Sequence, residues 1–194
     1  MTGRSQDEVA VASPRQRLLA AADELFFARG IVNTGVDAIL DHARVARKTL
    51  YHQFGGKDGL VVEYLRTRDR RWTAHWQAAI DAQSTPEGRL LAIFDALDTW
   101  EDETRRARGC AFVDALVEVA DPSHPATSVV VDHWTAIAGC LRALAADTDA
   151  DDPDRLAADV ELIYRGALSA MMLEPPSVAV ERARALAHSR LDVA

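Results

Sequence analysis

The sequence has only two cysteines and no long apolar run, and both absences limit what the chain can be. Cys110 and Cys140 are too few to build a disulfide scaffold. No apolar stretch approaches the roughly 18 to 20 residues needed to span a bilayer. The segment from Met1 to Ser13 is polar and lacks the basic flank and apolar stretch of a secretory signal. We therefore expect a cytoplasmic protein with no membrane partner.

The motifs of common catalytic and metal sites are also missing. The chain contains no Walker phosphate loop, no GxGxxG dinucleotide motif and no nucleophile elbow. Its six histidines show no metal-ligand spacing such as HExxH. Asp147, Asp149 and Asp151 resemble the start of a calcium loop, but Asp152 and Ala158 stand where that loop needs Gly and Glu. We expect no catalytic site, no metal site and no cofactor, and we interpret the two cysteines as small buried hydrophobes instead of a redox pair.

The charge of the chain is unevenly distributed. The 194 residues carry a formal net charge of -8, which is unfavourable for a nucleic-acid partner. The segment from Ser13 to Asp58, however, has seven basic and five acidic residues, a net +2 that leaves -10 for the rest. Both lysines of the chain, Lys48 and Lys57, lie in this segment. The distribution is typical of a protein that touches DNA with one end only.

The hydrophobic pattern predicts an all-α fold. No window shows the sustained period-two alternation of a strand, whereas apolar residues recur at helical spacing almost throughout. Ser13-Pro14, Thr85-Pro86 and Asp152-Pro153 each combine a capping residue with a proline suited to the first helical turn. About nine helices are expected, over residues 14–29, 34–43, 47–53, 57–82, 86–106, 110–120, 125–146, 153–173 and 177–191.

The second and third of these helices form a candidate helix-turn-helix. They are short, they are separated only by Arg44 to Ala46, and the first helix precedes them as a brace. A DNA-reading helix needs one apolar face, one polar face and a rigid N-terminal end. Val45, Leu50 and Phe54 supply the apolar face. The polar face supplies the predicted DNA-binding residues, which together with flanking positions are Thr34, Arg44, Arg47, Lys48, Thr49, Tyr51, His52 and Lys57.

The chemistry of these side chains suggests separate roles. Arg47 and Lys48 can donate hydrogen bonds to guanine O6 and N7, which reads sequence. Thr34, Tyr51 and His52 suit phosphate oxygens, which fix the register on the duplex without reading bases. Thr49 can reach a base edge or a phosphate, and Arg44 can add a phosphate contact. Lys57 begins a long helix, where its ammonium and the backbone N–H groups can hold one phosphate. Thr34 is also expected to cap the second helix.

The stretch from Arg17 to Leu60 resembles the DNA-binding domain of TetR/AcrR-type repressors. The matching text is "RLLAAADELFFARG", then "NTGVDAIL", then "ARVARKTLYHQFGGKDGL". This chain has Arg44 where the family usually has a turn glycine, and Ala46 where a hydroxyl residue often caps the reading helix. The resemblance implies a DNA-binding domain over 13–58, a helical ligand-binding and dimerisation domain over 59–194, and repression of a double-stranded DNA operator that a small-molecule effector releases.

The residues of the larger domain allow this reading but carry no comparable motif. The helices over 153–173 and 177–191 have small residues on one face, which suits close packing in a homodimer or in an internal core. Aromatic and apolar candidates for an effector pocket are Phe94, Trp100, Cys110, Phe112, Trp134, Tyr164 and Met171. Two other classes stay open from the residues alone: a small helical enzyme, and a helical protein whose helix-turn-helix contacts another protein.

Overall fold

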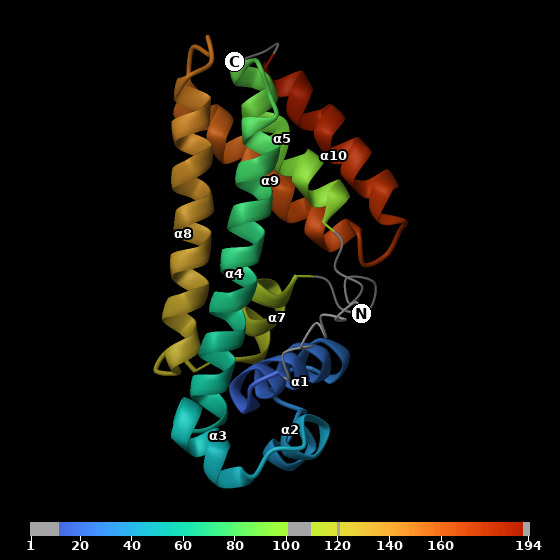
Figure 1. Ribbon diagram of the computed structural model, residues 1–194. Helices are drawn as coiled ribbons and strands as arrows, with labels where there is room; N and C mark the ends of the chain where they lie inside the picture. The colour runs from blue at the N-terminus through green and yellow to red at the C-terminus, as the bar shows by residue number, and fades with distance from the viewer. Residues whose placement is uncertain (1–11, 101–109, 120, 192–194) are drawn as a thin grey trace, which may run out of the picture.

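The computed structural model describes residues 12–100, 110–119 and 121–191, and every regular element in these ranges is an α-helix. A head made of α1, α2 and α3 lies at the bottom of Figure 1, and a larger helical body lies above it. The elements are α1 (Pro14–Arg29), α2 (Val36–Ala43), α3 (Arg47–Phe54), α4 (Lys57–Asp81), α5 (Pro86–Thr99), α7 (Ala111–Glu118), α8 (Pro125–Ala146), α9 (Pro153–Ala170) and α10 (Pro176–Leu191). The expected all-α fold is confirmed.

Three helices begin where the cap-and-proline pairs predict. The Ser13 hydroxyl accepts from the Gln16 N–H at 3.2 Å, and the Gln16 side chain accepts from the Ser13 N–H at 2.8 Å, which completes a capping box. The Thr85 hydroxyl caps α5 and the Asp152 carboxylate caps α9, each by accepting at 3.0 Å from the N–H of the third residue of its helix. In each case a proline occupies the first turn, where its missing N–H costs no helical hydrogen bond.

Other helix ends differ from the expected ones. The helix expected to reach Arg106 ends at Thr99, because Trp100 has extended backbone, and residues 101–106 lie outside the described part of the chain. The helix expected to reach Leu173 ends at Ala170. There the chain tightens, since the Leu173 N–H bonds back only three residues to the Ala170 carbonyl. Hydrophobic periodicity continues through such a turn, so it places the helix end too late.

The helix α4 belongs to both halves of the molecule. One buried cluster joins α1, α2, α3 and the start of α4 with Phe112 of α7 and Val130 of α8. The other joins the C-terminal half of α4 with α5, α8, α9 and α10 around Phe94. Figure 1 shows α4 rising from the head and running beside α8 through the length of the body. Because the head cluster includes residues of α7 and α8, the predicted domain boundary after Asp58 stays a prediction.

The sharp entry into α4 depends on two glycines. Gly55 ends α3 with φ 73°, a left-handed conformation that glycine adopts at little steric cost. At Gly59 a Cβ atom would lie 1.8 Å from the Phe54 carbonyl oxygen, so no larger residue fits without moving the backbone. The pair lets α3 pack directly against the first turn of α4.

By length and composition, α8 could cross a membrane, which the sequence analysis did not anticipate. It is the one such helix in the described ranges. In the structure it packs along α4 and α9 and also contacts α5 and α7. It buries His133, which is only 4% exposed. Only 33% of the apolar window of α8 is buried in the structure, so packing within the body covers part of its apolar surface.

Candidate nucleic-acid interface and cavity

The turn between α2 and α3 forms without the glycine that the family resemblance leads one to expect. Arg44 has φ 52° and ψ 51°, the only positive φ among the described residues that are not glycine. A left-handed residue at this point closes α2 and turns the chain. Arg17 of α1 stabilises the closure, because its Nε donates to the Ala43 carbonyl oxygen at 3.2 Å. The expected turn is present, and Arg44 adopts its left-handed conformation despite the steric strain on a residue with a Cβ atom.

The two faces of α3 differ as a DNA-reading helix requires. Leu50 is completely buried against α1 and α4, and it holds the helix to the head. On the opposite face Arg47, Lys48 and His52 are exposed, and Tyr51 is 51% exposed. Arg44 is exposed beside them and Thr49 is half-buried. The structure therefore brings most of the predicted DNA-binding residues together on one surface.

Arg47 on this surface already has an ion-pair partner. A guanidinium nitrogen of Arg47 forms an ion pair with Asp37, which lies in the first turn of α2. Both side chains are largely exposed, at 53% and 79%. An exposed ion pair contributes only about 0 to 1 kcal/mol, so a phosphate or a base edge can replace the carboxylate at small cost.

Lys57 joins the head to the body. Its ammonium lies 3.4 Å from the Val32 carbonyl oxygen, and the Val32 N–H donates to Glu118 of α7 at 2.9 Å. Burial lowers the pKa of Lys57, while the charges of Asp58 and Glu118 act in the opposite direction. The first turn of α4 has no side-chain cap. Lys57 therefore lies beside uncapped N–H groups, as a phosphate contact requires, but it is half-buried instead of fully exposed.

Thr34 does not have the role that the sequence predicts. Its side chain is 1% exposed, and its hydroxyl donates to the carbonyl oxygens of Gly30 at 2.6 Å and Leu25 at 3.2 Å. The residue that caps α2 is Gly35, and it makes no side-chain cap. Thr34 therefore secures the end of α1, and its buried hydroxyl is withdrawn from the set of DNA contacts. The sequence pattern predicts that a threonine just before a helix caps that helix. Here the Thr34 side chain is buried against α1 instead, and this burial determines the orientation of its hydroxyl.

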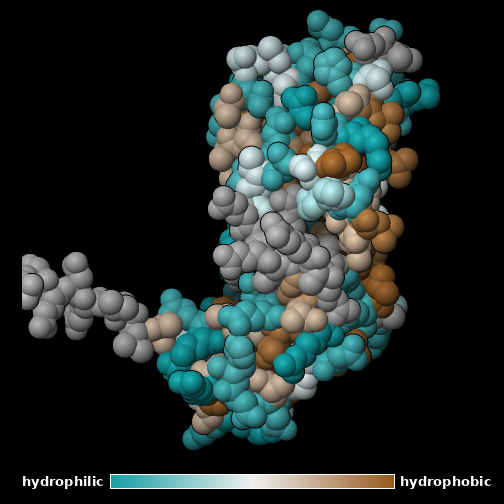
Figure 2. Space-filling view, turned by 90° about the vertical axis from the view of Figure 1, so that its right-hand side faces the viewer, coloured by the Kyte–Doolittle hydropathy of each residue, from teal (hydrophilic) through white to brown (hydrophobic). Residues whose placement is uncertain are grey.

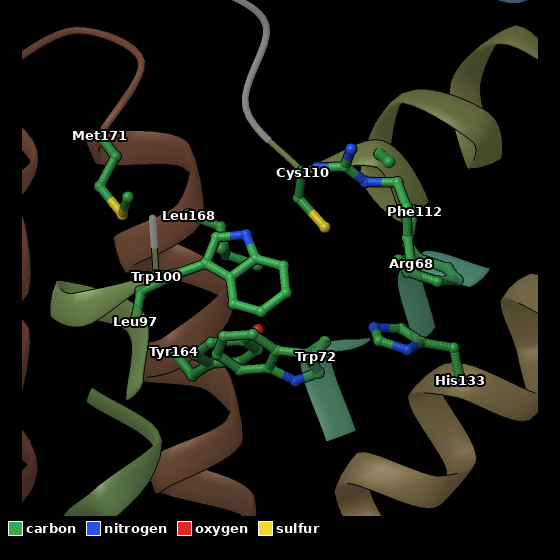
Figure 3. A pocket seen from close by; sticks show the side chains of 11 residues that line it. Arg68, Trp72, Leu97, Trp100, Cys110, Phe112, His133, Tyr164, Leu168 and Met171 are labelled. Carbon is green, nitrogen blue, oxygen red and sulfur yellow. The ribbon is translucent and has the colours of Figure 1, made fainter. Parts of the chain in front are cut away.

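A cavity of about 70 Å³ lies in the body between α4, α5, α7, α8 and α9. This volume is well below the roughly 300 to 1,000 Å³ of typical small-molecule sites, so a ligand of ordinary size would require the wall to move. Its described lining residues are Arg68, Trp72, Leu97, Trp100, Cys110, Ala111, Phe112, His133, Tyr164, Leu168 and Met171 (Figure 3). Five of the seven candidates from the sequence are among them, namely Trp100, Cys110, Phe112, Tyr164 and Met171.

Two candidates do not line this cavity. Phe94 is fully buried in the body cluster, where it packs as ordinary core. Trp134 lies behind the wall, with its ring 5.2 Å from the His133 ring and 6.4 Å from the Tyr164 ring. The Arg165 guanidinium lies over Trp134 at 4.2 Å. Aromatic composition alone could not separate these core and second-layer rings from the wall.

Six described residues of the wall were not among the candidates from the sequence: Arg68, Trp72, Leu97, Ala111, His133 and Leu168. A signal was present for the two polar ones. Arg68 is four residues from Tyr64 and from Trp72, so it interrupts the buried row of α4. His133 likewise lies between Val129 and Ile137 on the buried row of α8. A charged or titratable residue in an apolar row is a candidate for a polar role inside the body.

The polar groups of the wall are held by specific contacts. Nδ1 of His133 lies 2.6 Å from Asp69, and its ring stacks on Phe112 at 3.5 Å. Burial lowers the pKa of His133, and the Asp69 carboxylate opposes that shift. Burial also raises the pKa of the Cys110 thiol, which disfavours the reactive thiolate. No group of three His, Cys, Asp or Glu side chains in the described ranges could hold a metal ion.

The outer surface of the α9–α10 pair is apolar and slightly hollowed. A shallow groove is lined by small residues that include Gly166, Ala170 and Ala183. Large apolar side chains are exposed around it, with Leu162 at 71% and Leu186 at 55%. Figure 2 shows apolar side chains gathered along one edge of the body, whereas the head is mostly hydrophilic. The head and this edge of the body therefore offer surfaces of different chemistry.

An exposed cationic helix, braced as the second helix of a helix-turn-helix and joined to a helical body with a cavity, defines a DNA-binding transcriptional regulator. Residues 18–64 match the family model described as bacterial regulatory proteins, tetR family. The crystal structure of SCO4454, a TetR-family transcriptional regulator from Streptomyces coelicolor, is 31% identical, with a TM-score of 0.84 over 92% of this chain and 94% of that chain. The chain belongs to the TetR family of transcriptional regulators.

Two curated relatives differ in how much of the chain they match. The HTH-type transcriptional regulator YjdC from Escherichia coli (strain K12) is 27% identical over 91% of this chain and 93% of its own length. The HTH-type transcriptional repressor KstR2 from Mycolicibacterium smegmatis is 31% identical, but over 49% of this chain and 52% of its own length. The likeness to YjdC and SCO4454 therefore includes the body as well as the head.

Proposed function

We propose that the chain is a repressor that binds a DNA operator as a homodimer and is released by a small molecule in the body cavity. The observation that carries the DNA-binding part is the surface of α3, where Arg47, Lys48, Tyr51 and His52 are exposed while Leu50 is fully buried. Arg44, Thr49 and Lys57 flank this surface. KstR2 carries the word repressor in its name, which favours repression over activation here.

The sharpest test of the interface removes one cation and one aromatic hydroxyl from α3. We expect the double variant Lys48→Ala plus Tyr51→Ala to lose at least about ten-fold in affinity for DNA from the chain's own promoter region. The loss of the Lys48 charge should also reduce the slope of log affinity against log salt by about 1. Fluorescence anisotropy with labelled DNA at several salt concentrations measures both quantities.

The matched control is Arg155→Ala, which removes an exposed positive charge from α9, far from the head. It should leave DNA affinity and the salt slope unchanged. If the double variant binds as tightly as the wild type, α3 is not the reading helix and the proposed interface is wrong.

Dimerisation follows from the reach of a single head. One reading helix contacts few base pairs, whereas a two-fold dimer places two heads about 34 to 36 Å apart on successive major grooves. The exposed apolar side chains and small residues of α9 and α10 suit a four-helix interface. We expect Leu162→Glu plus Leu186→Glu to give a monomer in analytical ultracentrifugation.

The matched control is Leu116→Glu on α7. Leu116 is an exposed leucine as well, at 57%, but it lies outside the α9–α10 surface. This variant should remain a dimer. A dimer in the double variant would move the interface elsewhere on the body.

A further inference from the structure

Val32 is contacted from two sides at the junction of the head and the body. It lies in the turn between α1 and α2 and is 61% exposed. Its N–H donates to Oε2 of Glu118 at 2.9 Å, and its carbonyl oxygen lies 3.4 Å from the Lys57 ammonium. Glu118 is the last residue of α7, and Lys57 is the first residue of α4. One residue of the head therefore connects a carboxylate of the body with the cation that begins α4.

Charge, more than hydrogen bonding, favours the Lys57 ammonium at this junction. A distance of 3.4 Å exceeds the usual range of about 2.7 to 3.2 Å for an N–H···O hydrogen bond, so the Val32 carbonyl binds the ammonium weakly. The carboxylates of Glu118 and Asp58 both act to raise the pKa of Lys57, against the larger lowering by burial. Asp58 lies on the same helix as Lys57, whereas Glu118 comes from α7. The attraction between Lys57 and Glu118 therefore links α4 to α7.

A DNA phosphate at the start of α4 would compete with this attraction. Lys57 lies beside the N–H groups of the first turn of α4, which no side chain caps. A phosphate placed there accepts from these N–H groups and pairs with the ammonium. An ammonium that turns toward the phosphate loses part of its attraction to Glu118. The Glu118 carboxylate therefore opposes this DNA contact.

The helix that carries Glu118 also reaches the cavity. Ala111 and Phe112 in the first turn of α7 line the cavity, and Glu118 lies at the other end of this eight-residue helix. Phe112 and Ala115 are buried in the same cluster as residues of α1, and Figure 1 shows α7 directly above α1. A shift of α7 would therefore carry the Glu118 carboxylate toward or away from Lys57.

We propose that Glu118 is an autoinhibitory residue, which competes with a DNA phosphate for the Lys57 ammonium. This inference rests on the proposed function, because it requires Lys57 to contact DNA. The hydrogen bond from the Val32 N–H places the carboxylate at the start of α4, and the charge of that carboxylate weakens DNA binding. When DNA binds, the ammonium turns from Glu118 to the phosphate. The position of α7 thereby sets the strength of one contact to DNA.

The first experiment is a double-mutant cycle on the full chain. Glu118→Gln keeps an oxygen that can accept from the Val32 N–H but removes the charge. It should strengthen binding to promoter DNA by about three-fold at about 50 mM salt, where charges are weakly screened. In a Lys57→Gln background the same substitution should change the affinity by less than about 1.5-fold. Fluorescence anisotropy with labelled promoter DNA gives the affinities of all four proteins.

The cycle separates competition for Lys57 from simple repulsion of DNA. Repulsion between Glu118 and the phosphates does not depend on Lys57, so an equal gain in both backgrounds would overturn the proposal. Unchanged or weaker DNA binding by Glu118→Gln would overturn it as well. The matched control is Asp41→Asn, which removes an exposed carboxylate from α2. Its effect on DNA affinity should be the same with and without the Lys57 charge.

The second experiment uses no DNA. The chain has only two lysines, Lys48 and Lys57, so NMR of isotopically labelled lysine follows each side chain through an alkaline titration. Lys48→Arg leaves a single signal, which assigns Lys57. Because the Glu118 charge acts to raise the pKa of Lys57, Glu118→Gln should lower that pKa, whereas Asp41→Asn should leave it unchanged. A Lys57 pKa that is identical in wild type and Glu118→Gln would overturn the proposal.

The two levels of inference fail separately. If Lys48→Ala plus Tyr51→Ala weakens DNA binding but the gain from Glu118→Gln does not depend on Lys57, the regulator stands and the competition is wrong. If that double variant binds DNA normally, the proposed function fails and the competition fails with it, even where NMR shows that Glu118 and Lys57 interact.

Discussion

Arg47 in the head and Arg68 in the body each pair with an aspartate, but the two ion pairs lie in different surroundings. Arg47 and Asp37 are 53% and 79% exposed, whereas Arg68 and Asp23 are 9% and 28% exposed. Water screens the first pair, so exchanging its partner changes the free energy of the protein little. The second pair lies in a poorly solvated site, where removing one partner leaves a costly charge.

The difference explains how one side-chain chemistry can do two tasks. The exposed Arg47–Asp37 pair can exchange its carboxylate for another anion at small cost in free energy. The Arg68–Asp23 pair is exchanged less easily, because separating poorly solvated charges costs more free energy than separating exposed ones. Solvent exposure, more than residue type, therefore separates a binding surface from a selective contact.

The largest expected effect compares the two aspartates directly. Asp23→Ala should lower the free energy of unfolding by about 2–3 kcal/mol, because it removes the carboxylate that pairs with the nearly buried Arg68. Asp37→Ala should lower it by at most about 1 kcal/mol, from the exposed pair and the helix dipole. Urea unfolding of both variants measures the difference, and equal losses would remove the contrast between the pairs.

A smaller effect concerns the pH dependence of the body. Burial lowers the pKa of His133 below its usual 6.5, against the opposing influence of Asp69 and with a further lowering by Arg165. As the pH falls through 6.5 the unfolded chain takes up a proton before the folded one, so the free energy of unfolding decreases toward the lowered pKa.

His133→Gln should flatten that decrease, whereas His52→Gln on the exposed face of α3 should leave it unchanged. Thermal unfolding measured between about pH 7.5 and pH 5.5 gives the slopes. A slope that is identical in wild type and His133→Gln would show that this histidine titrates normally.

The left-handed conformation of Arg44 predicts that a glycine at this position would increase the stability of the protein. Arg44 has φ 52°, which costs a residue with a Cβ about 1 kcal/mol. Arg44→Gly should therefore raise the free energy of unfolding by about 0.5–1 kcal/mol while it removes an exposed cation. Arg44→Ala removes the same charge but keeps the strain, so it should give no such gain in urea unfolding. A gain of equal size in both variants would point to charge instead of backbone geometry.

The smallest expected effect sharpens the account of the exposed pair. Asp37→Asn releases Arg47 and removes a negative charge beside the DNA surface, so binding to DNA of unrelated sequence should strengthen by about two-fold at low salt. Raising the salt concentration should abolish the gain. Weaker binding in this variant would mean that Asp37 positions Arg47 for DNA instead of competing with it.

Much of the head could be predicted from sequence because short-range chemistry determines it. Ser13 caps α1, the turn falls at Arg44, and the alternation of Leu50 with Lys48 and Tyr51 separates the two faces of α3. The prediction that Thr34 caps α2 was wrong, because the carbonyl oxygens of Leu25 in α1 and of Gly30 just after it orient the Thr34 hydroxyl, and a local sequence pattern does not contain these contacts.

The cavity was harder to predict because its wall comes from five helices that are distant in sequence. Only the packing of the helices determines which aromatic candidates line the cavity and which lie in the core. It places Phe94 in the core and Trp100 at the cavity wall. Arg68 and His133 were detectable only as polar interruptions of buried rows, and their partners Asp23 and Asp69 lie on other helices.

The uninterrupted course of α4 has a geometric consequence. Its 25 residues span about 37 Å at 1.5 Å per residue. A tilt of about 5° around the Asp81 end displaces Lys57 by about 3 Å, which equals a whole hydrogen-bond length. In a two-fold dimer the opposite displacements add to about 6 Å, nearly two base-pair steps along the duplex axis. In the proposed dimer, a tilt of α4 by a few degrees would therefore be enough to move both α3 helices out of phase with the grooves.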